Sequence, residues 1–355
     1  MLCPRCYREY PNDAERCVHD GEPLTRASKI ALLRSQQSDE VGVVIGGRYR
    51  VIGLIGKGGM AHVYLAEDEK TKEPVALKVL YGAARADPRV RARFLREASA
   101  AAAIGHPNIL RIFKDGEHTD GSPYLVMEFL FGESLGELLR REGALDEDIA
   151  LPILAQAASA LVAAHAAGII HRDVKPDNVY LLGEPGDPYA VKLVDFGFAK
   201  LAEGGFTAVG TAIGTPQYMA PEQVLTDPVD ARTDVYALGV VMYRMFTGVL
   251  PFVHQGDAEL LTQQLLVPPA PPRSVAPALD EAIESVILKA LRKRPENRYP
   301  TMQAFLEDLE RLLGEREGEI HARGPAPESD TFEARGPLGK SATPFFHKTL
   351  ESMKA

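Results

Sequence analysis

The most informative part of the sequence is His171-Arg172-Asp173-Val174-Lys175-Pro176-Asp177-Asn178, which is followed by Asp195-Phe196-Gly197. It places a candidate base, a candidate phosphate-binding lysine and two candidate magnesium ligands close together. Phosphoryl transfer needs such a set, because metal ions neutralise the phosphate oxygens and a carboxylate orients the attacking hydroxyl. A single Asp or Asn is usually a turn or cap residue. That interpretation does not account for the ordered set, so the stretch favours phosphoryl transfer.

The composition is that of a globular chain. It has 355 residues, of which 45% are hydrophobic, and this suggests two or three compact units with sizeable cores. The formal net charge of -9 argues against a general binder of nucleic acid backbones. All three cysteines precede Asp20, so no disulfide framework runs through the main body. We therefore expect no nucleic-acid partner and a reducing, cytoplasmic location.

Neither a signal peptide nor a membrane span is expected. The first residues, Met1-Leu2-Cys3-Pro4-Arg5-Cys6, lack the apolar core of a signal peptide. The apolar stretch 235–250 is short for a membrane span and is interrupted by Arg244.

Hydrophobic patterning predicts a sheet-rich segment followed by a mainly helical one. The strand-like runs are separated by glycine or charged turns, which indicates an antiparallel sheet, and they cover 49–52, 63–66, 75–80, 109–113 and 124–129. The predicted helices cover 87–104, 146–167, 233–247, 279–291 and 301–313. Residues 314–355 show little periodicity apart from a possible short element at 344–353, and we expect a mostly disordered tail.

A second group of motifs lies in the sheet-rich segment. Ile55-Gly56-Lys57-Gly58-Gly59-Met60-Ala61-His62-Val63 is either an ordinary hairpin turn or a cradle whose small residues let backbone N–H groups approach phosphates. Lys78 ends an apolar strand, where it is either a snorkelling edge lysine or a phosphate ligand. Glu97 lies on the next predicted helix and could pair with Lys78 or face solvent. The order of the three motifs favours a nucleotide site.

With these motifs, residues 48–313 resemble the eukaryotic-like serine/threonine protein kinases, in particular their bacterial members. Gly214-Thr215-Pro216-Gln217-Tyr218-Met219-Ala220-Pro221-Glu222 resembles the end of a kinase activation segment, and Asp234-Val235-Tyr236-Ala237-Leu238-Gly239 resembles the central helix of the large lobe. Arg298 stands where the family places an arginine that pairs with the glutamate here numbered Glu222. The resemblance implies an α+β, bilobal kinase fold. Its small N-lobe (48–130) is an antiparallel sheet with one helix, and its larger C-lobe (131–313) is helical.

The resemblance also implies catalytic roles. Asp173 would orient the hydroxyl of the substrate, and Lys175 would steady the γ-phosphate. Lys78, paired with Glu97, would hold the nucleotide phosphates. Asn178 and Asp195 would hold Mg²⁺, which prefers oxygen ligands. His171 would be structural, packing under the catalytic loop near Phe196.

ATP is the nucleotide that the family implies. Met127 resembles the residue that guards the back of the adenine pocket, and residues 128–130 resemble the connector whose backbone bonds the purine edge. The implied nucleotide-binding residues are Ile55, Gly56, Lys57, Gly58, Gly59, Met60, Ala61, Val63, Ala76, Lys78, Met127, Glu128 and Leu130. Ala61 departs from the usual glycine pattern but keeps a small side chain.

The implied partners are protein substrates with serine or threonine acceptors, because Lys175 and Thr215 resemble the serine/threonine branch. Arg172 resembles the arginine through which many kinases sense a phosphate on the activation loop. This implies autophosphorylation between residues 197 and 215, in trans within a dimer if one forms. Thr207 is the first candidate and Thr211 the second, whereas Thr215 would bond Asp173. The alternative is that the first two are solvated loop threonines.

The N-terminal cysteines predict a zinc-ribbon-like head at residues 1–25, followed by a linker at 26–47. Cys3 and Cys6 have the spacing of a thiolate knuckle, and Cys17 supplies a third ligand. His19 and Asp20 are both candidates for the fourth ligand of a structural Zn²⁺. Reduced cysteines without a metal remain the alternative.

Two other functions compete with a protein kinase. A pseudokinase or nucleotide-binding scaffold would have degraded motifs, yet all five of the central residues are present: Lys78, Glu97, Asp173, Asn178 and Asp195. A small-molecule kinase is less compatible with the complete segment 214–222, which suits a protein substrate. The sequence therefore predicts a magnesium-dependent serine/threonine protein kinase.

Overall fold

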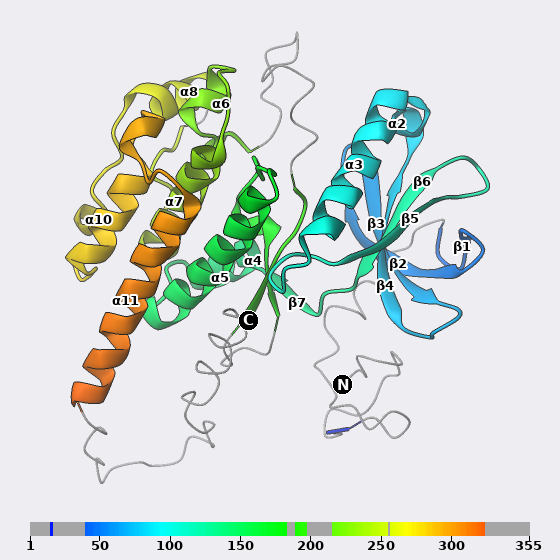
Figure 1. Cartoon of the computed structure of the whole chain (residues 1–355), viewed down its shortest axis with the longest axis horizontal. Helices are drawn as coiled ribbons and strands as arrows, with labels where there is room; N and C mark the ends of the chain where they lie inside the picture. Colours follow the sequence, from blue (N-terminus) through cyan, green and yellow to red (C-terminus); the bar gives the residue numbers. More distant parts are fainter. Residues whose placement is uncertain (1–14, 17–39, 183–188, 197–214, 255, 324–355) are drawn as a thin grey trace.

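The structure is a computed structural model that describes residues 15–16, 40–182, 189–196, 215–254 and 256–323. A twisted sheet with two helices forms one lobe, and a larger group of helices forms the other (Figure 1). A small three-stranded sheet lies between them. The expected bilobal α+β fold is confirmed.

The N-lobe sheet has six strands in the order β1-β2-β3-β4-β6-β5, and all neighbours are antiparallel. The strands are β1 (Val44–Ile45), β2 (Tyr49–Lys57), β3 (Ala61–Asp68), β4 (Pro74–Leu80), β5 (Ile112–Glu117) and β6 (Pro123–Glu128). Because β1 pairs with β2, the sheet begins before Arg48, in the segment that the sequence suggested was a linker.

Helix α3 (Pro88–Ile104) packs on this sheet after the short helix α2 (Gly82–Ala86). Its start is set by the side chain of Asp87, which accepts a hydrogen bond from Arg89 N at 2.8 Å, and by Pro88 in the first turn. It ends at Gly105, whose positive φ of 61° suits a left-handed cap. Phe94 anchors the helix in a cluster with Leu125 of the sheet.

The strand predicted at 109–113 begins instead at Ile112, and this part of the prediction is wrong. Ile109 forms a parallel bridge with Leu193. Asn108 reinforces that bridge, because its side chain donates to Val191 O at 2.9 Å and its carbonyl accepts from Leu193 N at 2.8 Å. Residues 108–110 therefore belong to the contact between the lobes rather than to the N-lobe sheet.

The C-lobe is built around α5 and α7, which lie against α11 in one apolar core. Its helices are α4 (Leu135–Glu142), α5 (Glu147–Ala166), α6 (Pro221–Val224), α7 (Ala231–Thr247), α8 (Asp257–Leu266), α9 (Pro272–Val275), α10 (Glu281–Ala290) and α11 (Met302–Arg323). Short 3₁₀ helices are η1 (Pro176–Asn178), η3 (Pro216–Tyr218) and η4 (Pro295–Asn297). The small sheet, β7 (Gly132–Ser134), β8 (Val179–Leu182) and β9 (Ala190–Leu193), carries the site and was not predicted.

Helix α5 corrects the expectation that no stretch could span a membrane. Among the described residues it is the one helix long and apolar enough to do so, by length and composition alone. Half of its apolar window is buried in the protein, where residues such as Ala158 and Leu161 contact the C-lobe core. The core helix of a folded lobe has the same composition, so α5 is explained by its packing.

Helix α11 also runs further than predicted. The sequence placed its end at Leu313, where the apolar pattern stops, but the helix continues to Arg323. Arg311 pairs with Asp308 at 3.3 Å and with Glu315 at 3.0 Å, one turn to each side. Such pairs support a helix beyond its buried face, so the segment from Gly314 to Arg323 is not the disordered start of a tail.

Candidate active site

A pocket opens where the two lobes meet. The N-lobe lines it with Lys78, Ile112, Leu125 and Met127 of the sheet and with Leu110, and the C-lobe contributes Asp195 and Phe196. An apolar wall with one cation and one carboxylate suits a flat, charged ligand.

Strand register puts the expected nucleotide residues on one face of the sheet. Val63 pairs with Lys78, and Ala76 pairs with Met127. Directly paired residues, and residues two apart on one strand, point to the same side. The side chains of Val63, Ala76, Lys78 and Met127 therefore share one face of the sheet, and Lys78 and Met127 line the pocket.

The glycine-rich stretch forms a hairpin at the end of β2 and β3. The strands extend to Lys57 and from Ala61, so the turn contains Gly58, Gly59 and Met60. Gly58 N donates to Ala61 O at 2.9 Å, and the hydroxyl of Tyr81 donates to Gly58 O at 2.9 Å. The stretch is thus a hairpin turn that the Tyr81 hydroxyl ties to the N-lobe. An ordinary turn and a phosphate cradle, the two interpretations, share this geometry. Ile55, before the turn, packs against the buried Leu65.

Lys78 and Asp195 join the two lobes directly. Lys78 Nζ donates to Asp195 Oδ1 at 2.6 Å. The Lys78 ammonium is the main reason that the pKa of Asp195 lies below its usual range. Glu97 lies on α3, but its side chain is outside what the structure describes.

Asp173 lies at the centre of the catalytic-loop contacts. Lys175 Nζ donates to Asp173 Oδ2 at 3.1 Å, and Asn178 Nδ2 donates to Asp173 O at 2.8 Å. Lys175 Nζ also donates to Thr215 Oγ1 at 3.4 Å. The expected link between Thr215 and Asp173 therefore runs through Lys175 in this structure. These four side chains come together as the sequence predicted.

The side chain of Asp234 in α7, which is fully buried, holds the backbone of the catalytic loop. Its two carboxylate oxygens accept from the backbone N–H groups of His171 and Arg172, each at 2.8 Å. Arg172 has a positive φ of 65°, which costs free energy in a residue other than glycine and needs such support. The sequence placed Asp234 on a central helix but gave no signal of this role.

His171 is structural, as expected. Its ring is completely buried, lies 4.6 Å from the ring of Phe196, and bonds Val194 O through Nε2 at 3.2 Å. Burial lowers the pKa of His171, and the neutral ring that this favours fits a packing role.

The donor set near Asp195 fits Mg²⁺. Asn178 Nδ2 faces Asp173, so its amide oxygen points to the other side of the amide group. Val194 N donates to Asn178 O at 3.0 Å and thereby holds the residue before Asp195 beside Asn178. One carboxylate and one amide oxygen are hard ligands of the kind that Mg²⁺ combines with phosphates and water. The described residues contain no cluster of three or more His, Cys, Asp or Glu that could hold another ion.

Glu128 forms a second contact between the lobes, which the sequence did not reveal. Its Oε1 accepts from Lys192 Nζ of β9 and from Arg111 N, both at 2.7 Å. Its backbone N–H donates to Arg111 O at 3.0 Å. The side chain and the backbone N–H of Glu128 thus both form hydrogen bonds with other residues of the chain.

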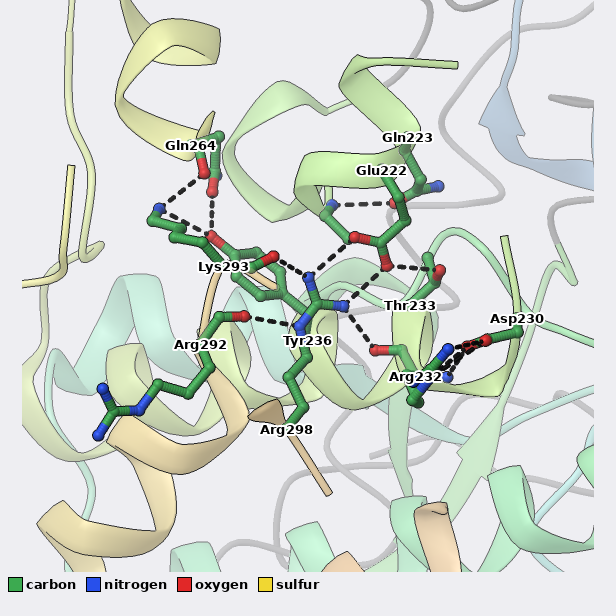
Figure 2. A network of polar contacts seen from close by, with 11 residues as sticks. Glu222, Gln223, Asp230, Arg232, Thr233, Tyr236, Gln264, Arg292, Lys293 and Arg298 are labelled. Atoms are coloured by element: carbon green, nitrogen blue, oxygen red, sulfur yellow. Dashed lines mark hydrogen bonds and ion pairs between the residues drawn. The ribbon is translucent and has the colours of Figure 1, made fainter. Parts of the chain in front are cut away.

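The predicted pair of Glu222 and Arg298 is confirmed. Arg298 donates to the two carboxylate oxygens of Glu222 at 2.7 and 2.8 Å, and both side chains are buried (Figure 2). Thr233 Oγ1 adds a third bond to Glu222 at 2.8 Å. The bidentate geometry anchors the end of the segment that begins at Thr215.

Several predicted residues lie outside the described part of the chain. They are the candidate zinc ligands Cys3, Cys6, Cys17, His19 and Asp20, and the loop threonines Thr207 and Thr211.

Comparison with known proteins agrees with this geometry. Residues 49–309 match the family model described as the protein kinase domain. The serine/threonine-protein kinase Pkn1 of Myxococcus xanthus is 44% identical over 82% of this chain and 42% of its own length. The serine/threonine-protein kinase PknB of Mycobacterium tuberculosis is 41% identical over 75% of this chain and 43% of its own length. The chain spans about half the length of the curated relatives it matches. The crystal structure of the Mycobacterium tuberculosis PknI kinase domain superposes with a TM-score of 0.61 at 31% identity, over 77% of this chain and 99% of that one.

Proposed function

Because this chain belongs to the protein kinase family, we propose that it transfers the γ-phosphate of ATP to serine and threonine hydroxyls of proteins. The observation that carries the proposal is the contact series from Asp173 through Lys175 to Thr215. It places a carboxylate, an ammonium and the start of the segment 215–222 around one point. A hydroxyl and a phosphate could meet there.

Each residue has a role that follows from its contacts. Asp173 accepts a hydrogen bond from the substrate hydroxyl and orients its oxygen toward the phosphorus. Lys175, already beside Asp173, balances charge on the transferred phosphoryl group, and Lys78 holds the other phosphates from the N-lobe. Mg²⁺, when held by Asn178 and Asp195, would neutralise phosphate charge.

Transfer of labelled phosphate from ATP to the protein itself and to a basic acceptor protein tests this proposal. We expect Asp173→Asn to lower the rate by about 10²- to 10⁴-fold, because the oriented base is lost. Asp177→Asn is the matched control, since Asp177 is half exposed and pairs with Arg140 at 3.4 Å. Equal rates in wild type and Asp173→Asn would contradict the proposal. No transfer by wild type, with ATP binding intact, would instead favour a nucleotide-binding scaffold.

We also propose that a phosphate on Thr207 activates the protein. The support is Arg172, whose backbone Asp234 fixes beside the base, and whose guanidinium has no ion pair among the described residues. A charged group that burial disfavours gains from an added anion. Phosphopeptide mapping after expression in a kinase-free host should find phosphate on Thr207, and Thr207→Ala should slow transfer more than Thr211→Ala. A loop without phosphate in the active protein would contradict this.

Trans-autophosphorylation in a dimer belongs to the same proposal. The initial rate of self-phosphorylation per molecule should rise with protein concentration if one copy acts on another. A rate per molecule that does not depend on concentration, in protein that sedimentation shows to be monomeric, would exclude the intermolecular route.

For the N-terminal head, we propose a structural Zn²⁺ held by Cys3, Cys6, Cys17 and either His19 or Asp20. The cysteine spacing supports it, and a segment this short has little apolar core without a metal. Elemental analysis of the purified protein should find about one zinc per chain, reduced by Cys3→Ala. Absence of zinc in the wild type would leave unliganded cysteines.

We place the kinase domain in the cytoplasm, where ATP is available.

A further inference from the structure

Gln264 of α8 is a fully buried amide that reaches the segment beside the catalytic loop. Its Nε2 donates to Gln217 O at 2.7 Å and to Pro216 O at 3.3 Å, both in η3. Thr215, the residue before η3, is the one that Lys175 contacts. Gln264 therefore holds the backbone immediately after Thr215, the residue that contacts Lys175.

The orientation of this amide is determined by its neighbours. The carbonyls of Pro216 and Gln217 can only accept, so the nitrogen of Gln264 must face them. The oxygen of the amide then faces Tyr236, whose hydroxyl donates to Gln264 Oε1 at 2.5 Å. Tyr236 is a rigid support because it is completely buried in α7. Figure 2 shows Gln264 and Tyr236 side by side with Lys293.

Lys293 fixes the helix that carries Gln264. Its ammonium donates to Gln264 O at 2.7 Å and to Gln263 O at 3.0 Å, and it lies 3.5 Å from the hydroxyl of Tyr236. Three acceptors match the three N–H groups of a lysine. The two carbonyls are near the C-terminal end of α8, where a cation is favourable. The ring of Phe252 covers the ammonium at 3.9 Å.

This cluster holds a different point of the segment from the pair of Glu222 and Arg298. That pair holds Glu222, at the C-terminal end of segment 215–222. Gln264 instead holds the carbonyl of Gln217, five residues before Glu222. The ring of Tyr236 separates the two, because the guanidinium of Arg298 lies 4.8 Å from its centroid. Arg298 Nη2 also donates to Lys293 O at 2.8 Å, so the two anchors belong to one network that fixes the segment at two points.

We propose that Gln264 is a positioning residue for the protein substrate. By holding the carbonyls of Pro216 and Gln217, it sets where Thr215 stands relative to Lys175 and Asp173. A polypeptide that presents a hydroxyl to Asp173 passes close to Thr215, because Lys175 contacts both residues. The proposal rests on the proposed function, and it adds that acceptor binding depends on a side chain that touches neither ATP nor the acceptor.

The test compares Gln264→Met with Gln263→Met by steady-state kinetics. Both variants exchange an amide for a thioether of similar size in the same helix, and only the first removes the bonds to η3. We expect Gln264→Met to raise the KM for a peptide acceptor by about five- to tenfold, as the loss of buried hydrogen bonds implies. The KM for ATP and the slow hydrolysis of ATP without acceptor should not change. Gln263→Met should behave as the wild type.

Two further measurements keep the proposal testable. Hydrogen exchange should be faster in Gln264→Met at the amides of Tyr218 and Met219, which donate to Thr215 O at 3.2 Å and to Pro216 O at 3.3 Å. This readout does not depend on phosphate transfer, so it separates failure of the inference from failure of the proposed function. If Gln264→Met does not fold, Tyr236→Phe removes the bond that orients the amide and should raise the acceptor KM to a smaller extent. An unchanged acceptor KM, or a KM for ATP that rises equally, would overturn the proposal.

Discussion

Lys293 is an ammonium without a carboxylate partner in the part of the chain that the structure describes. Burial, with repulsion from Arg298, lowers the pKa of Lys293 to about 7 from 10.5. Between these two pH values the unfolded chain binds more protons at this site than the folded chain. The contribution of Lys293 to the free energy of unfolding therefore rises as the pH increases through that window.

Chemical denaturation of wild type and Lys293→Met between pH 7 and 9 checks this prediction. The difference in the free energy of unfolding should shift in favour of the wild type by at most about 1.4 kcal/mol per pH unit. Partial exposure of the side chain will reduce the slope. A difference that is constant over this range would show that the ammonium keeps its proton throughout.

The residues that could be predicted from the sequence are those whose own side chains do the chemistry. Asp173, Lys175 and Asn178 stand at fixed spacing in one loop, and the structure brings them together. Gln264 and Asp234 act on backbone carbonyls and N–H groups. A backbone partner leaves no residue type to recognise, so only the folded chain shows these two roles.

Among the elements, the connector at the end of β6 shows how the lobes are held at their hinge. Glu128 accepts from Lys192 of β9, and the two side chains are about one-fifth exposed. We expect a double-mutant cycle with Glu128→Gln and Lys192→Met to give a coupling free energy of about 0.5–3 kcal/mol. Thermal or denaturant unfolding of the four proteins measures it. Additive effects would mean that Arg111 alone satisfies Glu128.

Element boundaries followed the sequence where a local signal sets them. Helix α3 was predicted within one residue because Asp87, Pro88 and Gly105 mark its ends. The start of strand β5 was predicted too early, at Ile109. Ile109 pairs instead with Leu193 of β9, more than eighty residues later in the chain. The three short strands of the small sheet were missed for the same reason, since each is set by pairing rather than by its own pattern.

In the whole chain, two lobes with separate cores meet at a few polar contacts and at Ile109, which is buried in the C-lobe core. The N-lobe clusters and the C-lobe core share few residues, and Lys78 with Asp195 bridges them beside the pocket. In the proposed function, the nucleotide phosphates bind beside these two side chains and contact both lobes. A ligand that contacts both lobes should therefore stabilise the chain as one unit, whereas a ligand of one lobe should not.

Thermal unfolding with and without ATP and Mg²⁺ tests this view of the two lobes. At an ATP concentration about 100 times the Kd, binding contributes about 2.7 kcal/mol, which corresponds to a rise in Tm on the order of 5 °C for a domain of this size. In the wild type, EDTA should remove the part of the rise in Tm that depends on Mg²⁺. Asp195→Asn should lack that part, because the carboxylate that would bind the ion becomes a neutral amide. Asp177→Asn, an exposed carboxylate of the catalytic loop, should keep the full shift. An EDTA-sensitive shift that survives in Asp195→Asn would place the ion elsewhere and remove Asp195 from the metal site.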